Sequence, residues 1–103
     1  MSRPKFRVIF PQGFDQRRQD EMALRGYLSD ALVELENGEQ YAVDFIEPSR
    51  LAHDLAGYLT SNIPCYAEPG LIVIPEVTMA TIQDAVSYLC ERDFFKQFRP
   101  VNT

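Results

Sequence analysis

The clearest pattern in the chain is a pair of runs, on either side of Asn37-Gly38, in which apolar and polar residues alternate. Alternation with a period of two is typical of half-buried strands, and Asn-Gly is a strong hairpin signal. A two-residue loop would pair Val33 with Ala42, whereas a three-residue loop, residues 36–38, pairs Val33 with Tyr41. The choice of loop therefore decides which side chains share a face.

Burial of apolar residues favours the three-residue loop, because a shift of one residue turns every side chain to the other face. This loop also gives Gly38 the left-handed position of a G1 bulge, which glycine adopts without strain. We therefore predict a β-hairpin over residues 27–47, with Glu34 across from Gln40 on the polar face. Its apolar face would hold Ala31, Val33, Leu35, Tyr41, Val43 and Phe45.

Two helices are predicted from spacings of three and four residues. The first, about residues 48–61, opens at Pro48, since proline is accepted in a first helical turn. The second, about residues 79–93, follows Thr78 as its N-cap. Each carries an apolar stripe that predicts a core-facing side: Leu51, Leu55, Tyr58 and Leu59 in the first, and Ile82, Val86, Leu89, Cys90 and Phe94 in the second.

Strands near residues 5–10 and 70–75 complete the predicted sheet. The first alternates between apolar and basic residues. The second contains the all-apolar run Leu71–Ile74, which is typical of an interior strand covered on both faces. The pattern of residues 15–25 fits two alternatives: a polar helix that ends at Gly26, or an early start of the next strand.

The pattern as a whole predicts a single α+β domain over residues 1–103. It would have a mixed sheet of about four strands, with the two helices packed on one face. A chain of 103 residues buries only about two-thirds of its surface, which allows one modest core. The limited core and the surplus of aromatic residues predict a homodimer.

Charge is distributed unevenly along this acidic chain, whose net charge is -5. Residues 30–54 carry seven acids and one base, whereas residues 1–29 carry six bases and three acids. An acidic surface attracts a basic protein partner and raises its association rate. We therefore expect Glu34, Glu36 and Asp44 to contribute to partner binding.

The aromatic residues near the C-terminal end suggest a second binding element. Phe95 and Phe98 lie beside Lys96 and Arg99, and aromatic residues of this kind are enriched at interfaces. The alternative is that they close the core.

Candidate chemistry is sparse. His53 is the only histidine and lies off the apolar stripe of its helix, which predicts a solvated position. Cys65 and Cys90 are too few for a disulfide framework and too widely spaced for a zinc site, so we expect reduced, mostly buried thiols. The sequence has no phosphate-binding or calcium-binding loop. It predicts no metal and no cofactor, and a small enzyme or ligand-binding domain near His53 or Cys65 is the alternative function.

Nucleic-acid binding is a third hypothesis, and it rests on the N-terminal bases. Phosphate binding normally needs a concentrated basic field, which the acidic chain opposes. The bases concerned are Arg3, Lys5, Arg7, Arg17 and Arg18.

No segment resembles a membrane span or a secretion signal. The longest apolar run, Leu71–Ile74, is far shorter than the roughly 20 residues that a spanning helix needs. We therefore expect a cytoplasmic location and no membrane contact. The favoured function is a non-catalytic, bacterial-type protein-interaction module, either regulatory or masking a basic effector as an immunity or antitoxin protein does.

Overall fold

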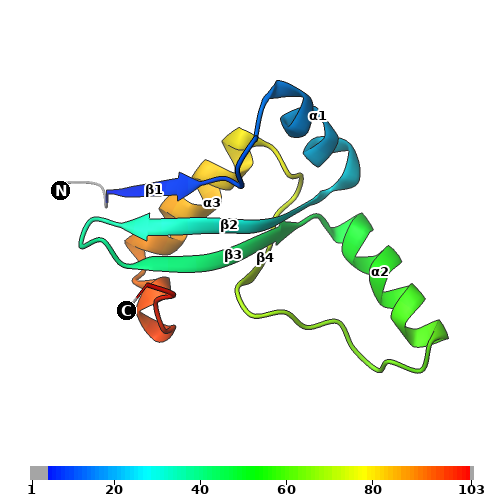
Figure 1. Ribbon diagram of the computed structural model, residues 1–103. Helices are drawn as coiled ribbons and strands as arrows, with labels where there is room; N and C mark the ends of the chain where they lie inside the picture. Colours follow the sequence, from blue (N-terminus) through cyan, green and yellow to red (C-terminus); the bar gives the residue numbers. More distant parts are fainter. Residues whose placement is uncertain (1–4, 103) are drawn as a thin grey trace.

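The computed structural model describes residues 5–102, and four of its segments form one mixed sheet (Figure 1). The strands are β1 (Phe6–Ile9), β2 (Tyr27–Leu35), β3 (Gln40–Ile46) and β4 (Leu71–Val73), in the order β1-β2-β3-β4. β2 pairs antiparallel with both β1 and β3, whereas β4 runs parallel to β3. The predicted α+β class and four-stranded mixed sheet are confirmed.

Residues 5–102 also form three α-helices, one more than predicted. They are α1 (Gln16–Arg25), α2 (Pro48–Thr60) and α3 (Met79–Glu91), and a short 3-10 helix, η1 (Phe94–Gln97), follows α3. None of the helices within residues 5–102 is long and apolar enough to cross a bilayer.

The hairpin has the predicted register. Val33 pairs with Tyr41, and Glu34 pairs with Gln40. Gly38 has a φ of 88°, and its N–H donates to the carbonyl of Leu35 at 2.9 Å. The three-residue loop therefore sets the pairing, and the apolar face of the hairpin turns toward the core.

A bulge interrupts β2 near its start. The register with β3 shifts between Leu28 and Ala31, where Asp30 has a left-handed φ of 64°. Aspartate tolerates this conformation better than most residues, and here its N–H donates to Asp44 Oδ1 at 3.0 Å. The extra residue changes the parity of the strand, so that Leu28 and Ala31 are both buried.

The core lies between α3 and one face of the sheet. Thr78 caps α3 as predicted, and its hydroxyl group accepts from the N–H of Thr81 in a reciprocal capping box. Ile82 and Val86 of α3 are fully buried. The buried cluster consists of Val8, Met22, Leu28, Ala31, Val33, Tyr41, Val43, Phe45, Ile74, Val77, Ile82, Val86 and Phe95.

The segment left open in the sequence forms α1. Asp15 caps it by accepting from the N–H of Arg18 at 2.9 Å, and Gly26 ends it with a φ of 66°. Of the ten described residues in α1, Met22 alone is buried. A helix with one buried residue has no apolar stripe, which is why the pattern did not favour it.

The segment between β3 and β4 differs from the prediction in two ways. β4 is an edge strand rather than an interior one: it pairs with β3 on one side, and Val73 is 51% exposed. Helix α2 forms where predicted but projects away from the sheet (Figure 1), and none of its residues is buried. The helix covering the sheet is therefore α3, and the apolar stripe of α2 has no core to face.

Candidate interaction surface

Residues 48–70, which comprise α2 and the segment that returns to β4, form an arm that extends from the sheet (Figure 1). The radius of gyration of the Cα atoms is 14.5 Å, whereas a compact domain of this length has about 13 Å. The arm makes the chain more extended than its length requires.

Helix α2 has one wide apolar face. Leu51 and Leu55 lie half-buried on one edge of this face. Ala52 and Ala56 are exposed on its other side, and Leu59, one helical turn further on, is 55% exposed. The apolar face of a surface helix ordinarily packs against a core. The exposed side of α2 is therefore a surface that lacks its cover in the isolated chain.

The start of the arm is held by Arg50. Its Nε lies 2.9 Å from Asp54 Oδ1, and its Nη1 donates to the carbonyl of Arg25 at 3.1 Å. Its guanidinium also lies 5.7 Å from the centre of the Tyr27 ring. These contacts fix the direction in which α2 leaves the sheet, and they pair the two opposite charges of the helix with each other.

The far end of the arm is uncharged and exposes apolar side chains among polar ones. The N–H of Ile63 donates to the carbonyl of Tyr58 at 2.9 Å, and Asn62 has a φ of 65°; this pattern is that of a Schellman helix end. Ile63 is 45% exposed. Residues 55–67 contain no Asp, Glu, Lys or Arg, so no charge opposes an apolar partner there.

The arm returns to the sheet through a group of acids and tyrosines. The hydroxyl of Tyr27 donates to Glu68 Oε2 at 3.2 Å, and that of Tyr66 donates to Glu68 Oε1 at 3.4 Å. The ring of Tyr66 also stacks on Tyr58 of α2, with 5.3 Å between the ring centres. Burial and the neighbouring carboxyl of Glu68 raise the pKa of Asp44 to about 6. This end of the arm is thus bound to β2 and β3.

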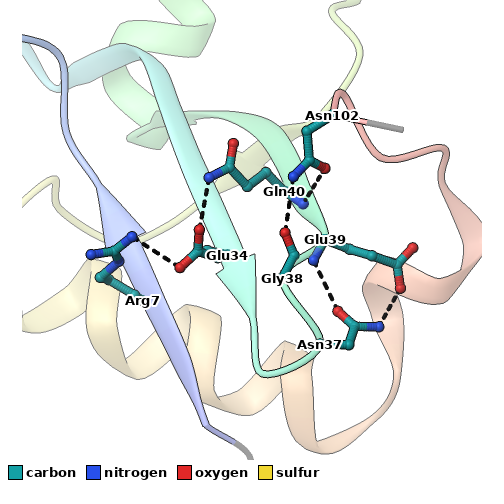
Figure 2. Close-up of polar contacts among 7 residues, drawn as sticks. All are labelled: Arg7, Glu34, Asn37, Gly38, Glu39, Gln40 and Asn102. Carbon is teal, nitrogen blue, oxygen red and sulfur yellow. Dashed lines mark hydrogen bonds and ion pairs between the residues drawn. The ribbon is translucent and has the colours of Figure 1, made fainter.

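The predicted acidic surface is less charged than its sequence suggests. Arg7 Nη2 lies 2.9 Å from Glu34 Oε1, and Gln40 Nε2 donates to Glu34 Oε2 at 2.7 Å (Figure 2). Asp44 has a raised pKa, which weakens its negative charge near pH 6. Glu36 is exposed in the hairpin loop. The basic neighbour of Glu34 and the raised pKa of Asp44 thus lower the negative charge that these acids present.

The two predicted aromatic anchors lie in different environments. Phe95 is 3% exposed and packs on Tyr41, with 5.5 Å between the ring centres. Phe98 is 46% exposed and lines a pocket of about 230 Å³ together with Tyr41, Gly70 and Val101. Phe95 is therefore a core residue, whereas the ring of Phe98 is accessible from outside.

The residues proposed for an enzyme site are exposed on the arm. In the part of the chain that the structure describes, the side chains of His53 and Cys65 form no hydrogen bond or ion pair. The expectation of mostly buried thiols is wrong for Cys65, because the arm stands away from the core; Cys90 is half-buried, and both are free. No group of three or more His, Cys, Asp or Glu residues within residues 5–102 could hold a metal.

Two of the N-terminal bases are paired with acids, whereas Lys5 and Arg18 are exposed and form no ion pair within the described residues 5–102. Arg7 is paired with Glu34, and Arg17 lies 3.3 Å from Glu21. Arg3 lies outside the described residues.

Comparisons with protein-family models, curated proteins and solved structures gave no match. The function is therefore argued from surface geometry. The arm is the surface that the sequence interpretation missed. Two features of the sequence indicated this surface. Ala52 and Ala56, together with Leu59, widen the apolar face of the helix, and residues 55–67 carry no charge.

Proposed function

We propose that this chain is a non-catalytic protein-interaction module that binds its partner through the arm. The observation that carries this proposal is that α2 has a wide apolar face and no buried residue. A helix of 13 residues is marginal alone in water, and most helical stability in proteins comes from packing of an apolar face. A partner on the arm supplies that packing.

The chemistry of the arm favours an apolar contact over an electrostatic one. Residues 55–67 are uncharged, and Arg50 and Asp54 neutralise each other. Binding through this surface is thus insensitive to salt, unlike the charge-driven masking of a basic effector by the acidic hairpin. The exposed, free thiol of Cys65 supports a reducing compartment such as the cytoplasm.

Capture experiments with matched variants test the proposal. The tagged chain, Leu59→Arg and Leu24→Arg are used as baits in lysate of the native source, at low and at high salt. Leu24 is the control because it is 87% exposed and belongs to α1, outside the arm. We expect wild type and Leu24→Arg to retain the same bound proteins at both salt concentrations, a second copy of the chain included, and Leu59→Arg to lose them.

Two results would contradict the proposal. Equal retention by all three baits would exclude the arm as the binding surface. A fourth bait, Glu36→Lys, tests the acidic hairpin. If the bound proteins are lost at high salt and from Glu36→Lys, but are retained by Leu59→Arg, the acidic hairpin would be the binding surface instead. Far-UV circular dichroism of each bait establishes that the fold is retained.

A further inference from the structure

We infer that the partner covering the arm is a second copy of this chain, and that the two α2 helices pack antiparallel about a two-fold axis. The inference rests on the proposed function above, because it names the occupant of the same surface. Most soluble oligomers are symmetric dimers in which one patch meets itself. The exposed side of α2 must therefore be complementary to itself.

The exposed area of the chain is sufficient for such a dimer. Its accessible surface is 7043 Å², whereas a folded monomer of 11.8 kDa exposes about 5,900 Å². The excess of about 1,100 Å² is larger than the roughly 800 Å² that each partner buries in a stable interface of standard size. The arm is one source of this exposed surface, and a second copy can cover part of it.

The exposed apolar residues of α2 can be set against one another in an antiparallel pair. Ala52, Ala56 and Leu59 are separated by four and three positions, and all three are exposed. An antiparallel copy centred between residues 56 and 59 sets Ala56 against Leu59 of the other protomer. A small side chain then meets a large one, which is the requirement for close packing between helices.

Small residues also allow the two helices to approach closely. Ala52 and Ala56 carry the smallest side chains of the exposed stripe. The distance between packed helices depends on the size of the side chains at their contact. Ala56 therefore allows close approach next to Leu59 of the other protomer.

Charge favours the antiparallel orientation. Each chain has a net charge of -5, so two copies repel wherever their acidic surfaces meet. The antiparallel arrangement keeps the two sheets at opposite ends of the helix pair and brings the uncharged residues 55–67 into the contact. It also opposes the two helix dipoles, whereas a parallel pair aligns them.

The absolute mass in solution tests whether the occupant is a second copy. We expect sedimentation equilibrium of wild type and Leu24→Arg, at tens of micromolar, to give twice the chain mass of 11.8 kDa. Leu59→Arg should give the single chain mass while keeping its circular dichroism spectrum. A monomeric wild type would overturn the inference. The proposed function would survive that result if Leu59→Arg still lost a different protein in the capture experiment.

A charge pair tests the orientation. Ala56→Lys and Leu59→Asp should each weaken the dimer by about 30-fold or more, because each places an unpaired charge in an apolar contact. The double variant should recover most of the lost dimer affinity, since the introduced lysine of one protomer faces the introduced aspartate of the other. In a parallel pair like charges would meet, and failure of the double variant to recover would overturn the antiparallel arrangement.

Discussion

Gly70 lies so close to Ala42 that a β-carbon at residue 70 would be 2.3 Å from the Ala42 carbonyl oxygen. The carbonyl of Gly70 in turn accepts from the N–H of Asp44 at 3.1 Å. This is the point where the arm rejoins the sheet, one residue before β4. The close approach, together with a φ of 76°, makes glycine a requirement for β4 to pair with β3.

We expect Gly70→Ala to destabilise the fold more than Gly13→Ala does. Both glycines have positive φ, but a β-carbon at Gly13 would meet no atom within 4 Å. Gly13→Ala should thus cost about 1–2 kcal/mol, the conformational penalty alone. Gly70→Ala should lower the free energy of unfolding by roughly 1–3 kcal/mol more, because either the strand shifts or the β-carbon clashes with the Ala42 carbonyl. Urea unfolding of the two variants measures the difference, and equal losses would show that the close approach relaxes freely.

The pKa of Asp44 predicts a dependence of stability on pH. Burial, and then the carboxyl of Glu68, raise this pKa from 3.8 to about 6 in the folded chain. The folded chain thus binds the Asp44 proton more tightly than the unfolded chain does. Its contribution to stability is complete below about pH 4 and is lost as the pH rises through about 6.

Asp44→Asn isolates this contribution, because asparagine keeps an acceptor for the N–H of Asp30. We expect the melting temperature of wild type, relative to the variant, to fall between about pH 4 and about pH 7. Glu68→Gln should reduce the slope, since it removes a carboxyl that raises the Asp44 pKa. If the difference in melting temperature between wild type and Asp44→Asn stays constant across this pH range, the pKa of Asp44 is not raised.

Asn102 bridges the hairpin loop to the C-terminal segment (Figure 2). Its Nδ2 donates to the carbonyl of Gly38 at 2.9 Å, and its Oδ1 accepts from the N–H of Gln40 at 2.9 Å. Asn102→Ala should cost about 1 kcal/mol. Asn102→Asp keeps the acceptor and should retain the hydrogen-exchange protection of the Gln40 amide, which the alanine variant loses. Loss of protection in both variants would show that the donor to Gly38 holds the bridge together.

Phe95 and Phe98 should respond differently to truncation. Phe95→Ala removes a buried ring and should cost about 3–5 kcal/mol. Phe98→Ala should cost less than about 1 kcal/mol, because the ring is 46% exposed. Chemical denaturation measures both values. A stable Phe98→Ala variant that loses its partner would place binding at the C-terminal pocket instead of the arm.

The hairpin could be predicted because local rules decide it. Parity of the apolar residues and the conformation of Gly38 leave one register, and the structure has it. The helical spacing of Leu51 and Leu55 likewise identified α2. Periodicity shows which side of a helix is apolar, but it does not show what lies against that side. The position of α2 away from the sheet was thus beyond this kind of inference.

The charged positions were harder to predict because their environment depends on neighbouring strands. Alternation put Glu34 and Asp44 on the same polar face, but the pairing of Arg7 with Glu34 depends on the register of β1 against β2. The bulge at Asp30 depends in the same way on its hydrogen bond to Asp44. Such tertiary contacts decide how much charge an acidic segment presents to a partner.

The position of α2 has a consequence for how the chain folds. Crossover helices ordinarily pack on the sheet that they connect, and this packing offsets the entropy lost when a loop closes. Here residues 47–70 close on β4 without that packing, so β4 should form last and open first, as a local unfolding unit. If two copies pair through their arms, assembly and completion of the sheet become a single cooperative step. The fourth strand would then be ordered by the partner as much as by the chain to which it belongs.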